Sequence, residues 1–272
     1  MKELEIITKK PEGERRGALV FLHGACHGAW CWENYLDFFP QHGYEACAFS
    51  LPGHGKSWGC ESSDKVTFQD YLDAVKIVLA PYNGEAVLVG HSLGGTIAQK
   101  VLTDGPELAS GCVLIATGMP MWLQKGFKGL REMIHVMAAP EFKSISRAMS
   151  REVPPDGETL RQSGFFRGRI SAEEAERMRE QMVVEKAGFP ANIKIDGAKM
   201  KAPVLVLASD YDVCSTLNMQ EKIAASYGTT PVVLHGLCHN MMLDPEWEIS
   251  AQAVLDFLDT IPYNRTNQEK MK

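Results

Sequence analysis

The sequence has no long apolar run, and this absence excludes several classes of protein. No hydrophobic stretch approaches the roughly 20 residues that a membrane-spanning helix requires, so we expect no membrane span. Residues Met1 to Glu5 are charged where a secretory signal is apolar, so no signal peptide is expected. Basic residues are not in excess, because the net charge is −6 and the isoelectric point is near 5.8. Nucleic acid and anionic membranes are therefore not expected as partners.

The cysteines form no pattern that indicates disulfides or a structural metal. There are seven, an odd number, and they are scattered along the chain. This usage is typical of reduced thiols, so we expect a cytoplasmic location. His23, Cys26, His27 and Cys31 are close in sequence, but their spacing matches no usual zinc pattern. We expect neither a metal nor another cofactor.

What the sequence does contain is an alternation of strand and helix patterns. Continuous apolar runs, typical of strands buried on both faces, are separated by helical periodicity. The expected strands are 4–8, 18–22, 44–49, 86–90, 112–116, 203–208 and 232–235, and the expected helices are 32–39, 67–79, 93–102, 217–226 and 245–258. In a chain of 272 residues this alternation predicts one α/β domain with a mostly parallel sheet between helices.

The alternation stops near Gly118 and resumes at Ala202. The segment between is rich in methionine and aromatic residues and has no strand pattern. Ser171 and Glu174 form a capping-box pattern, which predicts a helix from Ala175 to Ala187. We interpret 1–117 and 199–272 as the core domain and 118–198 as a helical insertion. Its apolar residues indicate either an apolar substrate or plain packing on the core.

Gly90-His91-Ser92-Leu93-Gly94 lies between a predicted strand and a predicted helix. A strand, a sharp turn with serine at its tip and a helix are typical of a nucleophile elbow. Such a turn strains the backbone of Ser92, so small residues are needed at Gly90 and Gly94. A serine hydroxyl also needs a histidine base, and the histidine needs a carboxylate that orients it.

Candidates for the acid and the base follow the last two predicted strands. The strand that ends at Ala208 leads to Asp210 and Asp212. We prefer Asp212 because the acid usually lies a few residues beyond the strand, and we expect Asp210 to cap the turn. The strand that ends at His235 leads to His239, which is the predicted base. His235 itself is expected to point into the packing of the sheet.

Two backbone N–H groups are candidates for an oxyanion hole. The N–H of Leu93 directly follows the nucleophile, and Ala25 lies in a loop of small residues after the strand 18–22. We interpret His23 and His91 as structural imidazoles.

These motifs, in this order, resemble the α/β-hydrolase superfamily over nearly the whole chain. The resemblance rests on His23-Gly24, the run LPGHGKS at 51–57, the serine elbow, Asp212 and His239. The run HGACHGAW at 23–30 is similar to that of the plant methylesterase and hydroxynitrile-lyase branch. The resemblance implies an eight-stranded, mostly parallel sheet flanked by helices. It also implies a helical cap after the sixth strand, which the insertion matches.

The branch also implies a choice between two reactions. Its cyanohydrin-cleaving lyases have threonine where this chain has Gly24, and lysine where it has Asn240 after the histidine. Both departures favour a serine hydrolase that cleaves a carboxylic ester of a small, largely apolar molecule through an acyl-enzyme. Thioesterase, monoacylglycerol lipase or lactonase activity stays open on the same triad. A small-ligand receptor and a cofactor-free lyase or oxygenase also stay open.

Two further points are left open by the sequence. Cys214 and Cys238 lie close to the predicted acid and base. We interpret them as packing thiols, with reactivity toward oxidants or alkylating agents left open. A homodimer is left open as the assembly.

Overall fold

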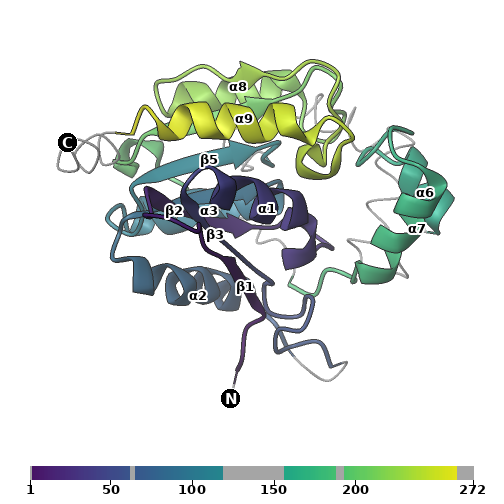
Figure 1. Ribbon diagram of the computed structural model, residues 1–272, viewed down its shortest axis with the longest axis horizontal. Coiled ribbons are helices and arrows are strands. Elements are labelled where there is room, and N and C mark those ends of the chain that lie inside the picture. The colour runs from purple at the N-terminus through teal and green to yellow at the C-terminus, as the bar shows by residue number, and fades with distance from the viewer. Residues whose placement is uncertain (1, 62–64, 119–155, 188–192, 262–272) are drawn as a thin grey trace.

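A seven-stranded sheet runs through the centre of the molecule (Figure 1). The computed structural model describes residues 2–61, 65–118, 156–187 and 193–261. The strands are β1 (Ile6–Lys9), β2 (Gly17–Leu22), β3 (Tyr44–Phe49), β4 (Ala86–His91), β5 (Gly111–Ile115), β6 (Val204–Ala208) and β7 (Val232–Val233). Their order across the sheet is β1-β3-β2-β4-β5-β6-β7. Only β1 is antiparallel to its neighbour.

The expected mostly parallel sheet is confirmed, but the expected eight strands are not. Seven strands pair within the described part of the chain. A single strand, β1, precedes β2, because residues 10–16 are charged or turn-forming and contain no apolar run.

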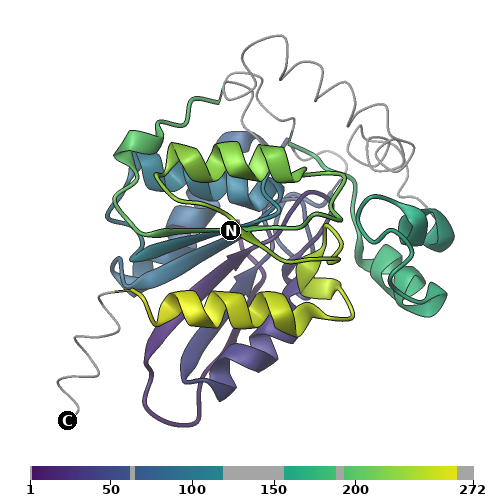
Figure 2. The same cartoon turned by 90° about the horizontal axis from the view of Figure 1, so that it is seen from above.

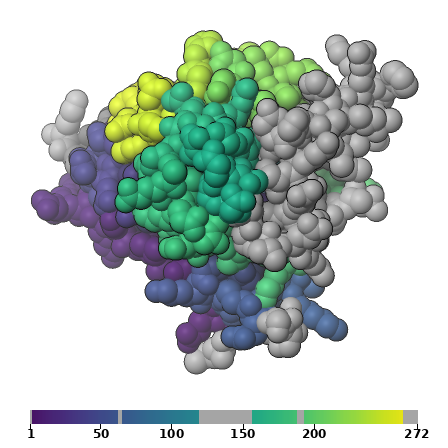
Figure 3. Space-filling view, turned by 90° about the vertical axis from the view of Figure 1, so that its right-hand side faces the viewer, coloured from purple at the N-terminus to yellow at the C-terminus, as the bar shows by residue number. Residues whose placement is uncertain are grey.

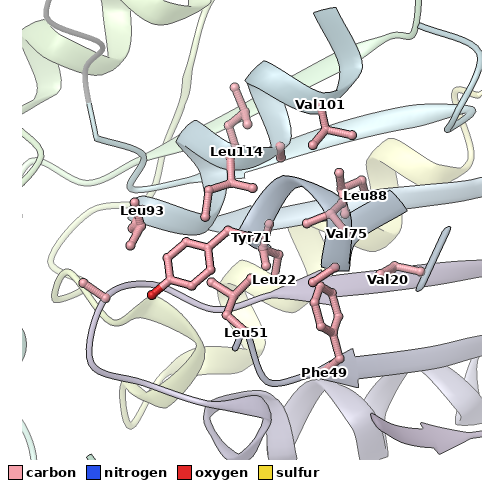
Figure 4. Close-up of a cluster of buried hydrophobic side chains, with 14 of the residues drawn as sticks. Val20, Leu22, Phe49, Leu51, Tyr71, Val75, Leu88, Leu93, Val101 and Leu114 are labelled. Atoms are coloured by element: carbon pink, nitrogen blue, oxygen red, sulfur yellow. The ribbon is translucent and has the colours of Figure 1, made fainter. Parts of the chain in front are cut away.

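Helices cover both faces of the sheet (Figure 2). One face carries α1 (Glu33–Gln41) and α9 (Trp247–Leu258), and the other carries α2 (Phe68–Leu79), α3 (Leu93–Asp104) and α8 (Leu217–Ser226). Side chains of a strand alternate between faces, so Val20 and Leu22 belong to one apolar cluster (Figure 4) and Leu19 and Phe21 to the other. This double burial explains the continuous apolar runs. Short 3₁₀ helices are η1 (Ala29–Trp32), η2 (Ala80–Tyr82), η4 (Gly197–Lys199) and η5 (Met241–Leu243).

The connections around β2 form a topological switch point at the carboxyl edge of the sheet. From β2 the chain crosses to β3 on one side and then returns to β4 on the other. Loops that follow two such strands diverge, and ligands bind between them in open α/β sheets. The loop that begins at His23 and the turn at Ser92 both leave the sheet at this point.

The described part of the predicted insertion lies beyond the same edge of the sheet. Its described helices are α6 (Gly157–Gln162) and α7 (Ala172–Gln181), and they lie at the centre of that end of the molecule in Figure 3. Most of the methionine and aromatic residues expected to line it, in 119–155, lie outside the described residues. Those that are described are buried against the core: Phe165, Phe166, Met178 and Met182.

Two local expectations were wrong. The capping box of Ser171 and Glu174 is present, but α7 ends at Gln181 because residues 183–187 pack on the core instead of continuing the helix. His235 is exposed rather than packed in the sheet. The reason is that β7 pairs with β6 over two residues only, and the chain then turns at Gly236, where φ is +77°. Within the described residues, no helix is long and apolar enough to span a membrane.

Candidate active site

Ser92 lies between β4 and α3 in a backbone conformation that residues other than glycine rarely adopt. Its φ is +50° and its ψ is −115°. A Cβ atom on Gly90 would lie 2.7 Å from the backbone nitrogen of Gly95, and one on Gly94 would lie 2.4 Å from the carbonyl oxygen of Leu22. The expected need for small residues at 90 and 94 is therefore confirmed. The turn also leaves Ser92 partly exposed.

The structure brings Asp212 and His239 together. Nδ1 of His239 donates to Oδ2 of Asp212 at 2.8 Å, and both side chains are buried. The other carboxylate oxygen, Oδ1, accepts the backbone N–H groups of Cys214 at 2.7 Å and Ser215 at 3.0 Å. The backbone thus fixes the carboxylate, and the carboxylate fixes the tautomer that leaves Nε2 of His239 able to accept a proton.

Asp210 has a different partner. Its carboxylate accepts from His235 at 2.7 Å and from the backbone N–H of Gly236 at 3.0 Å. These bonds tie together the two loops that follow β6 and β7. They lie at the exposed surface, away from His239.

His91 joins the serine elbow to the loop of His239. Its Nε2 donates to the carbonyl oxygen of His239 at 3.1 Å, and the two ring centroids are 4.9 Å apart. Burial holds the pKa of His91 well below its ordinary value, so the ring is neutral. Among the described residues, no hydrogen bond joins the hydroxyl of Ser92 to His239. Such bonds are often long before substrate binds and shorten in the reacting complex.

His23 holds the start of the loop that carries Ala25. Its Nδ1 donates to the carbonyl oxygen of Gly24 at 2.7 Å, and its Nε2 accepts the N–H of Leu51 at 2.9 Å. The carbonyl and the N–H of one trans peptide point in opposite directions. By fixing the carbonyl of Gly24, His23 therefore fixes the direction of the Ala25 N–H.

His27 holds the next carbonyl of this loop. Its Nδ1 donates to the carbonyl oxygen of Ala25 at 2.7 Å, and its Nε2 accepts from Asn240 at 3.1 Å. Burial lowers the pKa of His27 to about 4, so the ring is neutral near pH 7. His27 was considered only as part of a metal pattern in the sequence, and its position two residues after Ala25 gave no signal of this contact.

The predicted oxyanion donors flank Ser92. A Cβ atom on Gly24 would lie 3.1 Å from the Cβ of Ser92, so the Ala25 loop runs directly beside the serine. Leu93 begins α3, where the first N–H groups of a helix lack partners within the helix. Neither the Ala25 N–H nor the Leu93 N–H has a partner among the described residues. Two such donors beside a nucleophile can stabilise an oxyanion.

The hydrogen bonds of this site fit acid–base chemistry better than metal binding. Asp212, Cys214 and His239 have ligand atoms within 4.8 Å of one another. Nδ1 of His239 is already bonded to Asp212, however, and this geometry fits an acid–base pair. In the cluster near residue 26, His23 and His27 use both ring nitrogens in hydrogen bonds, and burial raises the pKa of the Cys26 thiol to about 12. A neutral thiol is a poor metal ligand.

The insertion contributes contacts that the sequence did not reveal. The ring of Phe165 stacks on His239 with centroids 5.7 Å apart, and its carbonyl accepts the N–H of Asn240 at 3.2 Å. Arg169 donates twice to the buried Asp244, at 2.6 and 2.8 Å. Asp244 in turn accepts the N–H of the residue before His239, at 2.9 Å. The richness in aromatic residues was the one signal for the first contact, and none pointed to the second.

Comparison with known proteins identifies the family. A sequence profile of the alpha/beta hydrolase family matches residues 19–251. The chain belongs to this family. It is 32% identical over 111 residues to Methylesterase 3 of Arabidopsis thaliana, and the aligned region covers 40% of this chain and 42% of that protein. It is 33% identical over 109 residues to Methyl jasmonate esterase 1 of Vitis vinifera, and the aligned region covers 39% of this chain and 41% of that protein. The chain thus matches about two fifths of the length of these relatives.

Solved structures support the fold over almost the whole chain. MenH from S. aureus aligns with a TM-score of 0.73 and 17% identity, and covers 94% of this chain and 98% of that one. Est816, described as an N-acyl homoserine lactone degrading enzyme, aligns with a TM-score of 0.69 and 22% identity, and covers 93% and 96%. At these identities the likeness concerns the fold alone. The α/β-hydrolase fold expected from the sequence is confirmed.

Proposed function

We propose that the protein is a serine hydrolase that cleaves a carboxylic ester of a small, largely apolar molecule. The observation that carries the proposal is the buried bond between Asp212 and His239, which follow β6 and β7 in a hydrolase with a strained serine elbow. In the proposed reaction Ser92 attacks the ester carbonyl while His239 accepts its proton. Asp212 orients the imidazole and stabilises its charged form.

The oxyanion and the leaving group complete the proposed cycle. The N–H groups of Ala25 and Leu93 bind the oxyanion as the carbonyl carbon becomes tetrahedral. His239 then gives its proton to the departing alcohol, and an acyl-enzyme forms on Ser92. Water, deprotonated by the same imidazole, hydrolyses that intermediate and restores the serine. No step requires a cofactor.

For the substrate we propose a methyl ester of a small carboxylic acid. Relatives named methylesterase and methyl jasmonate esterase support this choice. The ring of Phe165 against His239 supports an apolar environment around the base. Thioesters, monoacylglycerols and lactones undergo the same acyl transfer and are the nearest competitors.

Two contacts favour hydrolysis over cyanohydrin cleavage. A Cβ atom at position 24 would lie 2.8 Å from Nδ1 of His91, so the present packing requires glycine where the lyases have threonine. The Asn240 amide, at the position of the lyases' lysine, donates to His27.

The test is a panel of methyl, p-nitrophenyl and thiol esters of graded acyl length, with the Ser92→Ala protein as the blank. We expect ester turnover that Ser92→Ala abolishes, and covalent labelling of Ser92 by a fluorophosphonate. Equal turnover by Ser92→Ala would remove the nucleophile from the proposal. Very slow turnover of every substrate, with stabilisation by a ligand, would favour a receptor. Turnover without labelling of Ser92 would favour a cofactor-free lyase or oxygenase.

The remaining predictions extend this proposal. Residues 118–198 form a cap over a core of 1–117 and 199–272, and the position of α6 and α7 at the carboxyl edge of the sheet supports this division. A cytoplasmic location follows from the scattered, odd number of cysteines. We propose a homodimer as the assembly, which sedimentation would test.

A further inference from the structure

The loop that carries Ala25 contains a strained residue that needs support from outside the loop. Cys26 has a φ of +66°, a region that residues other than glycine rarely adopt. Such a conformation persists only where its surroundings fix it. The carbonyls of residues 24 and 25 are held by His23 and His27, as described above. The third carbonyl, of Cys26, accepts the N–H of Val183 at 3.1 Å.

Val183 begins a short stretch, residues 183–187, that we call the return segment. The return segment follows α7 and is anchored on the core by Glu185, which is 6% exposed. The hydroxyl of Tyr71 donates a short hydrogen bond to Oε1 of Glu185. Oε2 of Glu185 lies 3.3 Å from Nε2 of His54, and neither atom has another partner among the described residues.

The anchor fixes its carboxylate in one place. Burial raises the pKa of Glu185, but the facing His54 and the bond from Tyr71 outweigh it and leave this pKa below its ordinary value. The backbone of Cys26 also faces the carboxylate and lowers the same pKa. A buried carboxylate is costly away from such partners, so Glu185 cannot shift without losing them.

The partners of Glu185 are themselves held by further contacts. The ring of Tyr71 lies in one buried apolar cluster with Leu22, Leu51 and Leu93 (Figure 4). Nδ1 of His54 donates to the carbonyl oxygen of Pro52 at 3.2 Å. Glu185 therefore fixes the return segment to the packed core beside the elbow.

We propose that Glu185 is a positioning residue for the oxyanion hole. By anchoring the return segment it holds Val183 against the carbonyl of Cys26, and this bond keeps the Ala25 N–H beside Ser92. The inference rests on the proposed hydrolase function. Loss of the anchor releases the third carbonyl and lets Cys26 leave its strained conformation. Loss of an oxyanion donor slows acyl transfer by about 10²- to 10³-fold, so a partly displaced donor has a smaller but measurable effect.

The experiment compares Tyr71→Phe and Glu185→Ala with a matched control, Tyr35→Phe. Tyr35 donates or accepts one buried hydrogen bond, to Ser250 at 2.7 Å, on the opposite face of the sheet. We expect Glu185→Ala to lower kcat for a methyl ester about 30-fold and Tyr71→Phe about 10-fold, which is less than complete loss of a donor. KM should stay nearly unchanged, because the oxyanion develops only after the substrate is bound, as the ester carbonyl becomes tetrahedral. Tyr35→Phe should keep the wild-type kcat. Tyr71→Phe retains the packed ring, so it serves as the test if Glu185→Ala does not fold.

Amide hydrogen exchange gives a second readout that needs no ester turnover. Tyr71→Phe should speed exchange in both 23–28 and 183–187, and Tyr35→Phe should speed it in neither. If the wild-type protein hydrolyses no ester, the proposed function fails while exchange still tests the anchor. If the wild type hydrolyses esters but Tyr71→Phe leaves both kcat and exchange in 23–28 unchanged, the positioning role is overturned and the proposed function stands.

Discussion

The serine elbow and the segment 165–187 reach the same site by different means. The elbow, residues 90–95, is shaped by backbone atoms: the start of α3 leaves no room for a side chain at Gly90, and the end of β2 leaves none at Gly94. The segment 165–187 comes from far along the chain and acts through separate contacts, on His239, Asp244 and Cys26. The proposed nucleophile is thus positioned by the core, whereas the loops of the proposed base and oxyanion donor also contact the segment 165–187.

The largest expected effect lies within the core and separates two neighbouring carboxylates. Asp212→Asn should lower kcat by about 10⁴-fold, because an amide cannot fix the tautomer of His239 or stabilise its charged form. Asp210→Asn should leave kcat near the wild-type value, since Asp210 binds the exposed His235 instead. Steady-state kinetics on one ester measures both. A similar loss in the two variants would contradict the assignment of Asp212 as the acid.

The second effect concerns how the core supports the oxyanion loop. The pKa of His27 is about 4 in the folded protein and about 6.5 in an unfolded chain. The unfolded chain therefore binds a proton first as pH falls, so stability is full above about pH 6.5 and is lost as pH falls toward 4, by about 3 kcal/mol in total.

The measurement is the free energy of unfolding in denaturant at several pH values, for the wild type and for His27→Gln. His23 and His91 titrate in the same direction in the wild type, so the difference between the two proteins isolates His27. The variant should show a shallower dependence on pH. An identical slope would mean that His27 does not remain neutral in the fold.

A third effect tests the steric argument for the elbow. Alanine normally stabilises a helix by about 1 kcal/mol relative to glycine. At position 94, however, its Cβ would lie 2.4 Å from the carbonyl oxygens of Leu22 and His23, so Gly94→Ala should lower the free energy of unfolding by about 2 kcal/mol. Gly13→Ala, with nothing within 4 Å of its Cβ, is the control and should change little. Equal stability of the two variants would contradict the tight elbow.

The core and the proposed triad could be predicted from the sequence because their signals are local. A strand buried on both faces has a continuous apolar run, and the acid and base follow the ends of two such runs. The glycines of the elbow stand next to Ser92 itself. Each of these features can be recognised without knowing which distant residues come together.

The return segment could not be predicted for the opposite reason. Val183-Val184-Glu185-Lys186 continues the pattern of a capped helix with exposed charges. Glu185 and Tyr71 are 114 residues apart in the sequence, and only the fold brings them together and makes burial of the carboxylate favourable. His235 was misplaced for a related reason, because pairing at the edge of a sheet depends on how far the neighbouring strand extends.

The smallest expected effect tests whether the insertion also supports the loop of the base. Arg169 binds Asp244 through two hydrogen bonds, and Asp244 holds the backbone just before His239. Lysine keeps the charge but cannot make this paired contact, so Arg169→Lys should lower kcat by about 5- to 10-fold while the protein stays folded.

Arg161→Lys is a closely matched control for Arg169→Lys. Arg161 also binds one carboxylate through two hydrogen bonds, to Glu158 within its own helix, but that pair is exposed and holds no catalytic loop. Such surface pairs contribute little, so Arg161→Lys should match the wild type in both kcat and stability. If both arginine variants keep full kcat, the insertion acts on the oxyanion loop alone, and the base is positioned by the core. If only Arg169→Lys is slow, the insertion helps to position both the loop of the proposed base and the loop of the oxyanion donor. In that case only the serine is positioned by the core alone.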